Sequence, residues 1–143
     1  MSGRIMAVDY GEKNLGIAVS DVSATLAQPV GVIERSELRA DLERLAKLAR
    51  DYNVKRIVVG YPRTLAGTAG PQARAVDVFI KRLEKAFNLP VDRYDERLST
   101  REAKSWLAEM GIRGEKAKAA VDKVAAALVL QSYLDKKGKE ASV

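Results

Sequence analysis

Three acidic residues stand at positions where a carboxylate has an obvious chemical use. Asp9 ends an apolar run that predicts a buried strand, Glu96 follows directly after another predicted strand, and Asp122 lies inside a predicted helix rich in alanine and valine. Carboxylate oxygens are the ligands that hard cations such as Mg²⁺ prefer. Because a metal-activated water can attack a phosphodiester, the three acids indicate metal-assisted hydrolysis.

Each acid also has a purely structural interpretation. Asp9 fits a turn residue that bonds its own loop, and Glu96 fits a surface ion pair with Arg97. A salt bridge to Lys118 or Arg97 is the structural alternative for Asp122. Because Asp122 borders an apolar face, its charge needs a partner, and a cation is one such partner.

The composition narrows the chemistry further. The 143 residues include no cysteine and no histidine. Disulfides, thiolate or imidazole zinc sites, a cysteine nucleophile and a Ser-His-Asp triad are therefore excluded. The net charge is +6, which favours polyanionic partners such as nucleic acid.

Apolar periodicity predicts an α/β fold. Short apolar runs predict five strands, over residues 4–9, 15–20, 29–33, 56–60 and 89–94. Helices are predicted over residues 36–52, from Pro71, over 99–110 and over 115–136, with Ser36 as the first N-cap. The order is therefore βββαβαβαα. A mixed five-stranded sheet with helices on both faces accommodates it, with the first three strands antiparallel and two more added through helical crossovers.

The chain is expected to form one domain over residues 1–137, followed by a polar tail over residues 138–143. The start of the sequence carries no apolar segment typical of a signal peptide. The longest wholly apolar run, residues 124–130, is too short to cross a bilayer of about 30 Å. We therefore expect a cytoplasmic protein with no membrane partner.

Five stretches together resemble one known family. They are VDYGEKNLGIAVSD (8–21), VVGYP (58–62), GTAGPQA (67–73), DERLSTREA (95–103) and VDKVAA (121–126). In this order they are similar to the YqgF family, also called RuvX, which belongs to the RNase H-like superfamily and is similar to RuvC-type Holliday-junction resolvases.

The resemblance implies an RNase H-like fold and a nuclease that acts on structured nucleic acid. It also implies that Asp9, Glu96 and Asp122 are the catalytic acids and bind Mg²⁺ or Mn²⁺. The substrate that it favours is precursor ribosomal RNA, in maturation of the 5′ end of pre-16S rRNA. Branched DNA, in Holliday-junction resolution, is the alternative.

Two positions differ from the pattern of these proteins. Asn14 stands where the family commonly has Arg, which removes one candidate phosphate contact. Ala125 stands where RuvC-type enzymes often carry another metal ligand. A second metal would therefore need a ligand from Asp95, Asp21 or water.

The candidate substrate contacts adjoin these stretches. Gly67, Gly70 and the start of the helix at Pro71 are predicted to hold a phosphate through backbone amides, because helix N-termini attract anions. An ordinary glycine and proline loop is the alternative. The candidate cationic contacts are Lys13, Arg63, Arg74, Arg97, Arg101, Lys116 and Lys118.

Two other classes of protein are alternative interpretations of the sequence. Asp9, Gly11, Gly16 and Ala18 also resemble the first phosphate loop of actin-like ATPases and sugar kinases, but those proteins need two such domains and a much longer chain. A nucleic-acid-binding module with weak or no hydrolysis is the second, supported by Asn14 and Ala125. We expect a monomer or a homodimer, because resolution of a symmetric junction favours a two-fold dimer.

Overall fold

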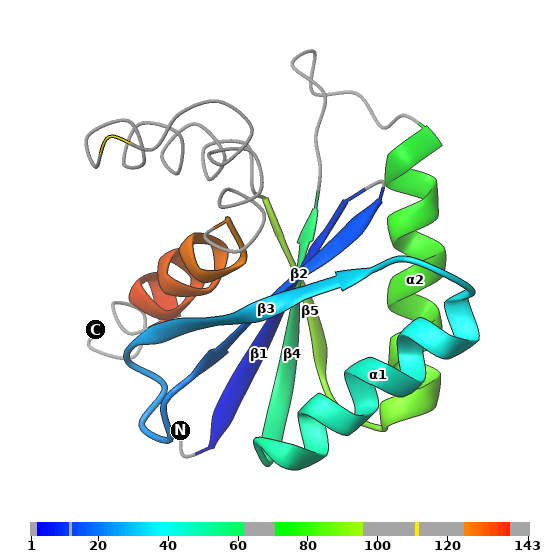
Figure 1. The fold of residues 1–143 in the computed structure, drawn as a ribbon. Coiled ribbons are helices and arrows are strands. Elements are labelled where there is room, and N and C mark those ends of the chain that lie inside the picture. The colour runs from blue at the N-terminus through cyan, green and yellow to red at the C-terminus, as the bar shows by residue number, and fades with distance from the viewer. Residues whose placement is uncertain (1–2, 12, 62–70, 96–110, 112–124, 138–143) are drawn as a thin grey trace.

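The computed structural model describes residues 3–11, 13–61, 71–95, 111 and 125–137. They form one five-stranded sheet with helices on both faces (Figure 1). The strands are β1 (Arg4–Tyr10), β2 (Asn14–Ser20), β3 (Ala27–Glu34), β4 (Val54–Tyr61) and β5 (Val91–Asp95). The helices are α1 (Leu38–Asp51), α2 (Pro71–Phe87) and residues 125–137.

The sheet has the order β3-β2-β1-β4-β5. Strands β1, β2 and β3 pair antiparallel, whereas β4 and β5 join through parallel pairs. The predicted five strands, the mixed sheet and the α/β class are therefore confirmed. The strand ends differ from the prediction by up to two residues. The predicted helix over residues 99–110 and the tail over 138–143 lie outside the described residues.

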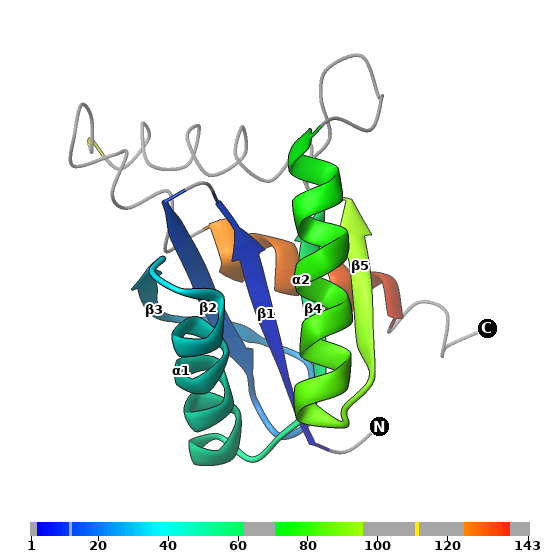
Figure 2. The ribbon, with the colours of Figure 1, turned by 90° about the vertical axis from the view of Figure 1, so that its right-hand side faces the viewer.

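The two faces of the sheet are covered by different helices. Helices α1 and α2 lie on one face, and residues 125–137 cross the other (Figure 2). Side chains alternate along a strand, so Met6 and Val8 pack beneath α1 and α2 while Ile5 and Ala7 pack beneath residues 125–137. Residues 5–8 are thus buried on both faces, which explains their continuous apolar run.

Small residues allow the last helix to lie close to the sheet. Ala125 and Ala126 are 2% and 0% exposed, and Val129 and Leu130 are fully buried. Ala126, Val129 and Leu130 pack in the same cluster as Ala7, Ala18 and Val58. The helix therefore packs tightly over the central strands.

Polar contacts fix both flanks of this helix. On the β5 side, the Tyr133 hydroxyl donates a hydrogen bond to Asp92, which also pairs with Arg56 at 2.9 Å. On the β3 side, the Gln131 side chain accepts from the Ala27 N–H and donates to the Thr25 carbonyl, both at 2.9 Å. Because the contacts lie on opposite flanks, the helix cannot slide across the sheet without breaking one of them.

The tight connection between β1 and β2 requires glycine at position 11. The Gly11 N–H donates to the Asn14 carbonyl at 3.0 Å, and a Cβ on Gly11 would lie 2.6 Å from that oxygen. Arg35 donates from Nη1 to the Gly11 carbonyl at 3.0 Å, with its guanidinium carbon 4.6 Å from the Tyr10 ring centroid. The hairpin end is therefore held from outside as well as within.

The start of α1 differs from the prediction. The N-cap is Glu37, which makes no capping hydrogen bond through its side chain. Ser36 does not cap the helix, because its N–H and hydroxyl both donate to the buried carboxylate of Asp41. The predicted serine cap was wrong by one residue, and an acid in the first turn binds the preceding residue instead.

The loop after β2 is organised by one carboxylate. Asp21 accepts hydrogen bonds from the Ser23 hydroxyl at 2.7 Å and from the Thr25 and Leu26 N–H groups at 2.8 and 3.1 Å. These donors lower the pKa of Asp21 to about 2, with Ser23 the largest contributor. The loop returns the chain to β3 at the end of the sheet where β1 begins.

Edge strand β3 is irregular. Its pairing with β2 shifts register between Ile17 and Ala18, and it contains Pro29, which has no N–H to donate.

Within the described part of the chain, no helix has the length and apolarity needed to cross a membrane.

Replacing Gly11 with alanine is expected to destabilise the hairpin. The added Cβ overlaps the Asn14 carbonyl oxygen, and overpacking of this kind costs about 1–3 kcal/mol. Urea unfolding of Gly11→Ala measures the loss. Gly31→Ala is the matched control, since a Cβ there meets nothing within 4 Å. Equal stability of the two variants would contradict the close approach at Gly11.

Removing the Tyr133 hydroxyl is expected to loosen the last helix. Tyr133→Phe deletes a hydrogen bond to a charged group, for a loss of about 1.5 kcal/mol in the free energy of unfolding. Tyr52→Phe, at an exposed tyrosine, should change stability little. Burial, then the bond to Asp92, raises the pKa of Tyr133 to about 12. The contribution should therefore be complete below pH 10 and lost as pH rises through 12, which unfolding measured against pH would show.

The Asp21 loop is expected to weaken in acid. The pKa of the Asp21 carboxyl group is lowered from 3.8 to about 2 in the folded protein. The stabilisation of the loop is therefore present above pH 4 and lost as pH falls towards 2. The measurement is the difference in unfolding free energy between the wild type and Asp21→Asn at several pH values. That difference should be constant above pH 5 and shrink below pH 4. A difference independent of pH would show that the charge of Asp21 does not stabilise the loop.

Candidate metal centre

The carboxyl ends of β1, β4 and β5 meet at one edge of the sheet. Asp9 of β1 pairs with Gly60 of β4, and Gly60 pairs with Tyr94 of β5. Asp95 pairs with Tyr61 one residue further along. Ligands of open α/β sheets bind outside the carboxyl ends of such strands, so this edge is where a site is expected.

Asp9 has the surroundings of a metal ligand. Its side chain is half-buried, and alternation along β1 places it on the face of Ala7, the face covered by residues 125–137. The residues beside it on the neighbouring strands are both glycines, Gly16 of β2 and Gly60 of β4. Neither neighbour in this row therefore has a side chain beside the carboxylate.

The carboxylate of Asp9 also lacks a structural partner among the described residues. No hydrogen bond or ion pair to it is made within residues 3–11, 13–61, 71–95 or 125–137. This removes the interpretation of Asp9 as a turn residue bonded to its own loop, as far as these residues go. A half-buried carboxylate with no partner among the described residues fits a hard cation such as Mg²⁺ or Mn²⁺.

Gly16 and Gly60 were not expected to shape the site. Both stand inside the apolar runs of predicted strands, where glycine often marks a close approach of a ligand or another backbone. Their position beside Asp9 depends on strand register, which the sequence pattern did not provide.

Two of the predicted cationic contacts belong to the described residues. Lys13 lies in the connection between β1 and β2, and Arg74 lies near the start of α2; both are exposed. Figure 2 shows the start of α2 at the same end of the sheet as the tip of β1. Both cations are therefore at the edge that carries Asp9.

The remaining predicted site residues lie outside the described part of the chain. They are Glu96, Asp122, Arg63, Gly67, Gly70, Arg97, Arg101, Lys116 and Lys118. Among the described residues alone, no three acids, cysteines or histidines come together as a metal-binding group. Asp9 is thus the described member of the predicted triad.

Asp21 is too far away to replace the ligand that Ala125 cannot provide. Strand β2 runs antiparallel to β1, so Asp21 follows the end of β2 at the opposite edge of the sheet from Asp9. Both of its carboxylate oxygens already accept hydrogen bonds within its loop. The suggestion that Asp21 completes the site was wrong, whereas Asp95 ends β5 at the edge of Asp9.

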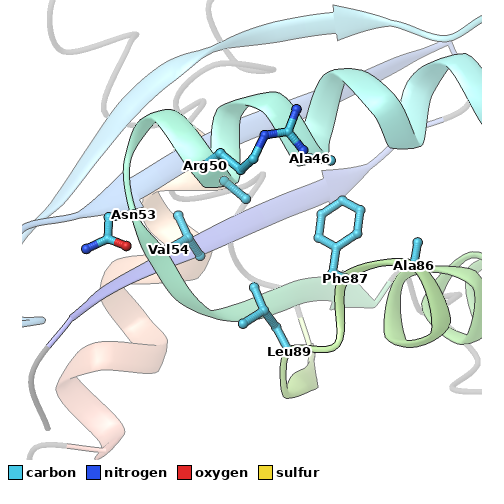
Figure 3. A pocket seen from close by; sticks show the side chains of 8 residues that line it. Ala46, Arg50, Asn53, Val54, Ala86, Phe87 and Leu89 are labelled. Carbon is cyan, nitrogen blue, oxygen red and sulfur yellow. The ribbon is translucent and has the colours of Figure 1, made fainter.

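A cavity of about 350 Å³ lies at the other end of the molecule (Figure 3). It is formed between the ends of α1 and α2, and its walls include Ala49, Arg50, Val54, Phe87 and Leu89. Val54 begins β4 and Leu89 precedes β5, so this cavity is at the amino end of the parallel strands. It is therefore separate from the edge that carries Asp9.

Comparisons with known proteins agree with this architecture. The Thermus thermophilus RuvC in complex with a Holliday junction substrate has a TM-score of 0.58 and 14% identity, with 95% of this chain and 96% of that chain covered. The fowlpox virus Holliday junction resolvase has a TM-score of 0.54 and 17% identity, with coverage of 93% and 99%. These likenesses confirm the RNase H-like fold.

Sequence comparison is more specific. A Heliobacterium modesticaldum protein named "Putative pre-16S rRNA nuclease" is 47% identical over 139 residues, which are 97% of this chain and 93% of that protein. The family model described as "RuvX: Holliday junction resolvase" matches residues 3–136. By both measures, this chain belongs to the RuvX family.

Proposed function

We propose that this protein is a metal-dependent endonuclease that hydrolyses phosphodiester bonds in structured nucleic acid. Its substrate in this proposal is precursor ribosomal RNA, cleaved in maturation of the 5′ end of pre-16S rRNA. The observation that carries the proposal is the Asp9 carboxylate, half-buried between Gly16 and Gly60 with no partner among the described residues. The name of the Heliobacterium relative supports the choice of RNA.

The other two acids are tied by the chain to described elements. Glu96 directly follows Asp95, the last residue of β5. The carboxyl end of β5 lies at the same end of the sheet as Asp9. Asp122 precedes the buried Ala125 by three residues, so their Cα atoms are at most about 11 Å apart. Ala125 begins the described part of the helix that packs over Ala7, two residues before Asp9.

In this proposal, Asp9, Glu96 and Asp122 would hold Mg²⁺ or Mn²⁺, which would supply an activated water and polarisation of the phosphate. The chain holds Asp9 on the rigid central strand, so its carboxylate needs little rearrangement when the substrate arrives. Lys13 and Arg74 hold phosphate oxygens at the same edge. With no histidine in the chain, no imidazole takes part in the proton transfers.

Holliday-junction resolution is a second candidate function. The description of the matching family model names that activity, and two resolvases share the fold. A metal-dependent cut next to Asp9 serves either substrate, so the two functions differ in the surface that binds nucleic acid. A module that binds nucleic acid without cutting it is the third possibility.

A cleavage assay separates these functions. A labelled pre-16S rRNA fragment and a four-way DNA junction are each offered to the protein with Mg²⁺, Mn²⁺ or EDTA. We expect cleavage of the RNA that EDTA abolishes. Loss of a residue that only hydrogen-bonds to a metal ligand lowers activity roughly 10–100-fold. Asp9→Asn and Asp122→Asn remove a ligand itself, so each should lower the cleavage rate by more than that. Both variants should still bind the RNA in EDTA.

Asp51→Asn is the matched control, because Asp51 is an exposed acid at the end of α1, away from Asp9. It should cleave as the wild type does. Cleavage of the junction alone would select the resolvase, and binding without cleavage would select the binding module. Normal cleavage by Asp9→Asn would refute the assignment of the site.

A further inference from the structure

A second cleft, lined mainly by polar side chains, lies beside edge strand β5, on the side of the last helix. It encloses about 240 Å³ and will be called the β5 cleft. Strand β5 contributes one wall and the end of helix 125–137 the other. The residues that line it are Asp92, Arg93, Tyr94, Tyr133, Lys136 and Lys137.

The one acid in the lining is already neutralised. The Asp92 carboxylate pairs with Arg56 at 2.9 Å and accepts a hydrogen bond from the Tyr133 hydroxyl. Arg93 pairs with Asp77 of α2 and remains about half exposed. The lining also includes the ammonium-bearing side chains of Lys136 and Lys137, which bring positive charge to the cleft.

Two aromatic rings hold the shape of the cleft. Tyr94 and Tyr133 pack edge to face with their centroids 5.8 Å apart, and the Tyr94 hydroxyl shares a 2.6 Å hydrogen bond with Ser132. The Lys137 ammonium lies 5.7 Å from the Tyr133 ring centroid, within the range of a cation–π contact. Lys136 and Lys137 are both exposed at the end of the helix. Packed aromatic rings therefore form one side of the cleft, and the long side chains of two lysines carry positive charge at its rim.

The β5 cleft and Asp9 are related through one row of the sheet. Tyr94, Gly60 and Asp9 lie in one row across three adjacent strands. Neighbouring strands are about 4.8 Å apart, so Tyr94 is about 10 Å from Asp9 along the row. A nucleic-acid strand whose reacting phosphate lies at Asp9 can therefore reach the cleft within a few nucleotides.

We propose that the β5 cleft binds a backbone phosphate of the substrate strand, a few nucleotides from the phosphate that is cleaved. The inference rests on the proposed function for its position on the substrate, but not for the binding itself. A lysine ammonium is a compact positive charge that can bind a phosphate. Such phosphate contacts fix the register of a strand without reading its sequence. Phosphodiester backbone is common to RNA and DNA, so the test includes both.

The first test is binding in EDTA, where no metal-dependent cleavage occurs. Fluorescence anisotropy follows a labelled RNA hairpin and a four-way DNA junction as salt is raised. Lys136→Ala/Lys137→Ala should weaken binding about tenfold and flatten the slope of log K against log salt by about 0.7–0.9 for each phosphate that the variant no longer neutralises. Weaker binding of one nucleic acid only would identify which backbone occupies the cleft.

Lys47→Ala/Lys85→Ala is the matched control. It removes the same charge from exposed lysines of α1 and α2, on the other face of the sheet. Its affinity and salt slope should stay near those of the wild type. An equal loss of affinity in both double variants would show that only overall charge matters and would overturn the inference.

Lysine acetylation read by mass spectrometry gives a second, direct test on the wild-type protein. Bound RNA or junction should protect Lys136 and Lys137 from the reagent while Lys47 and Lys85 stay reactive. Unchanged acetylation at Lys136 and Lys137, with cleavage active, would refute the β5 cleft and leave the nuclease standing. Protection without any cleavage would refute the nuclease and leave the cleft standing.

Discussion

The burial of β1 on both faces is the constraint on which the rest of the structure depends. This strand is hydrogen-bonded to β2 on one side and β4 on the other, and its residues 5–8 are buried on both faces. A charged side chain in the middle of such a strand would lose its hydration with nothing to replace it. The carboxyl end is where an acid is tolerated, and Asp9 stands there.

In the proposed site, β1 positions only Asp9, so other elements have to bring the remaining acids to it. The parallel register ties the end of β5 to the end of β1 through β4. The last helix is fixed independently, by Gln131 on one flank and Tyr133 on the other. These contacts join residues far apart in the chain, and a site assembled in this way depends on tertiary packing as much as on its own acids.

The pattern of the sequence was sufficient to predict the sheet, because burial on two faces leaves continuous apolar runs and helices leave a period of 3.6. Details governed by single polar contacts were less accessible. Serine is a residue type typical of N-caps, but Ser36 donates to Asp41 within the helix instead. Aspartate is a common metal ligand, but Asp21 accepts hydrogen bonds from its own loop, at the end of the sheet opposite Asp9.

The position of Asp9 at the end of a buried strand was predictable, because an acid directly after an apolar run is a local signal in the sequence. Gly16 and Gly60 give no such signal, because their value comes from standing beside Asp9 in the register of three strands. Likewise the contact of Tyr133 with Asp92 joins positions 41 residues apart, and no local pattern indicates it.

The irregular edge of the sheet has a consequence for how the molecule behaves in a crowded solution. An open strand edge is a template on which another chain can add a strand, and repeated addition leads to fibrils. In β3, Pro29 breaks the row of donors and the register shift opposite it bends the ribbon. A flat, unbroken run of hydrogen-bonding groups is therefore not presented there, and the nearby exposed apolar side chains of Val22 and Leu26 have no regular strand to nucleate on.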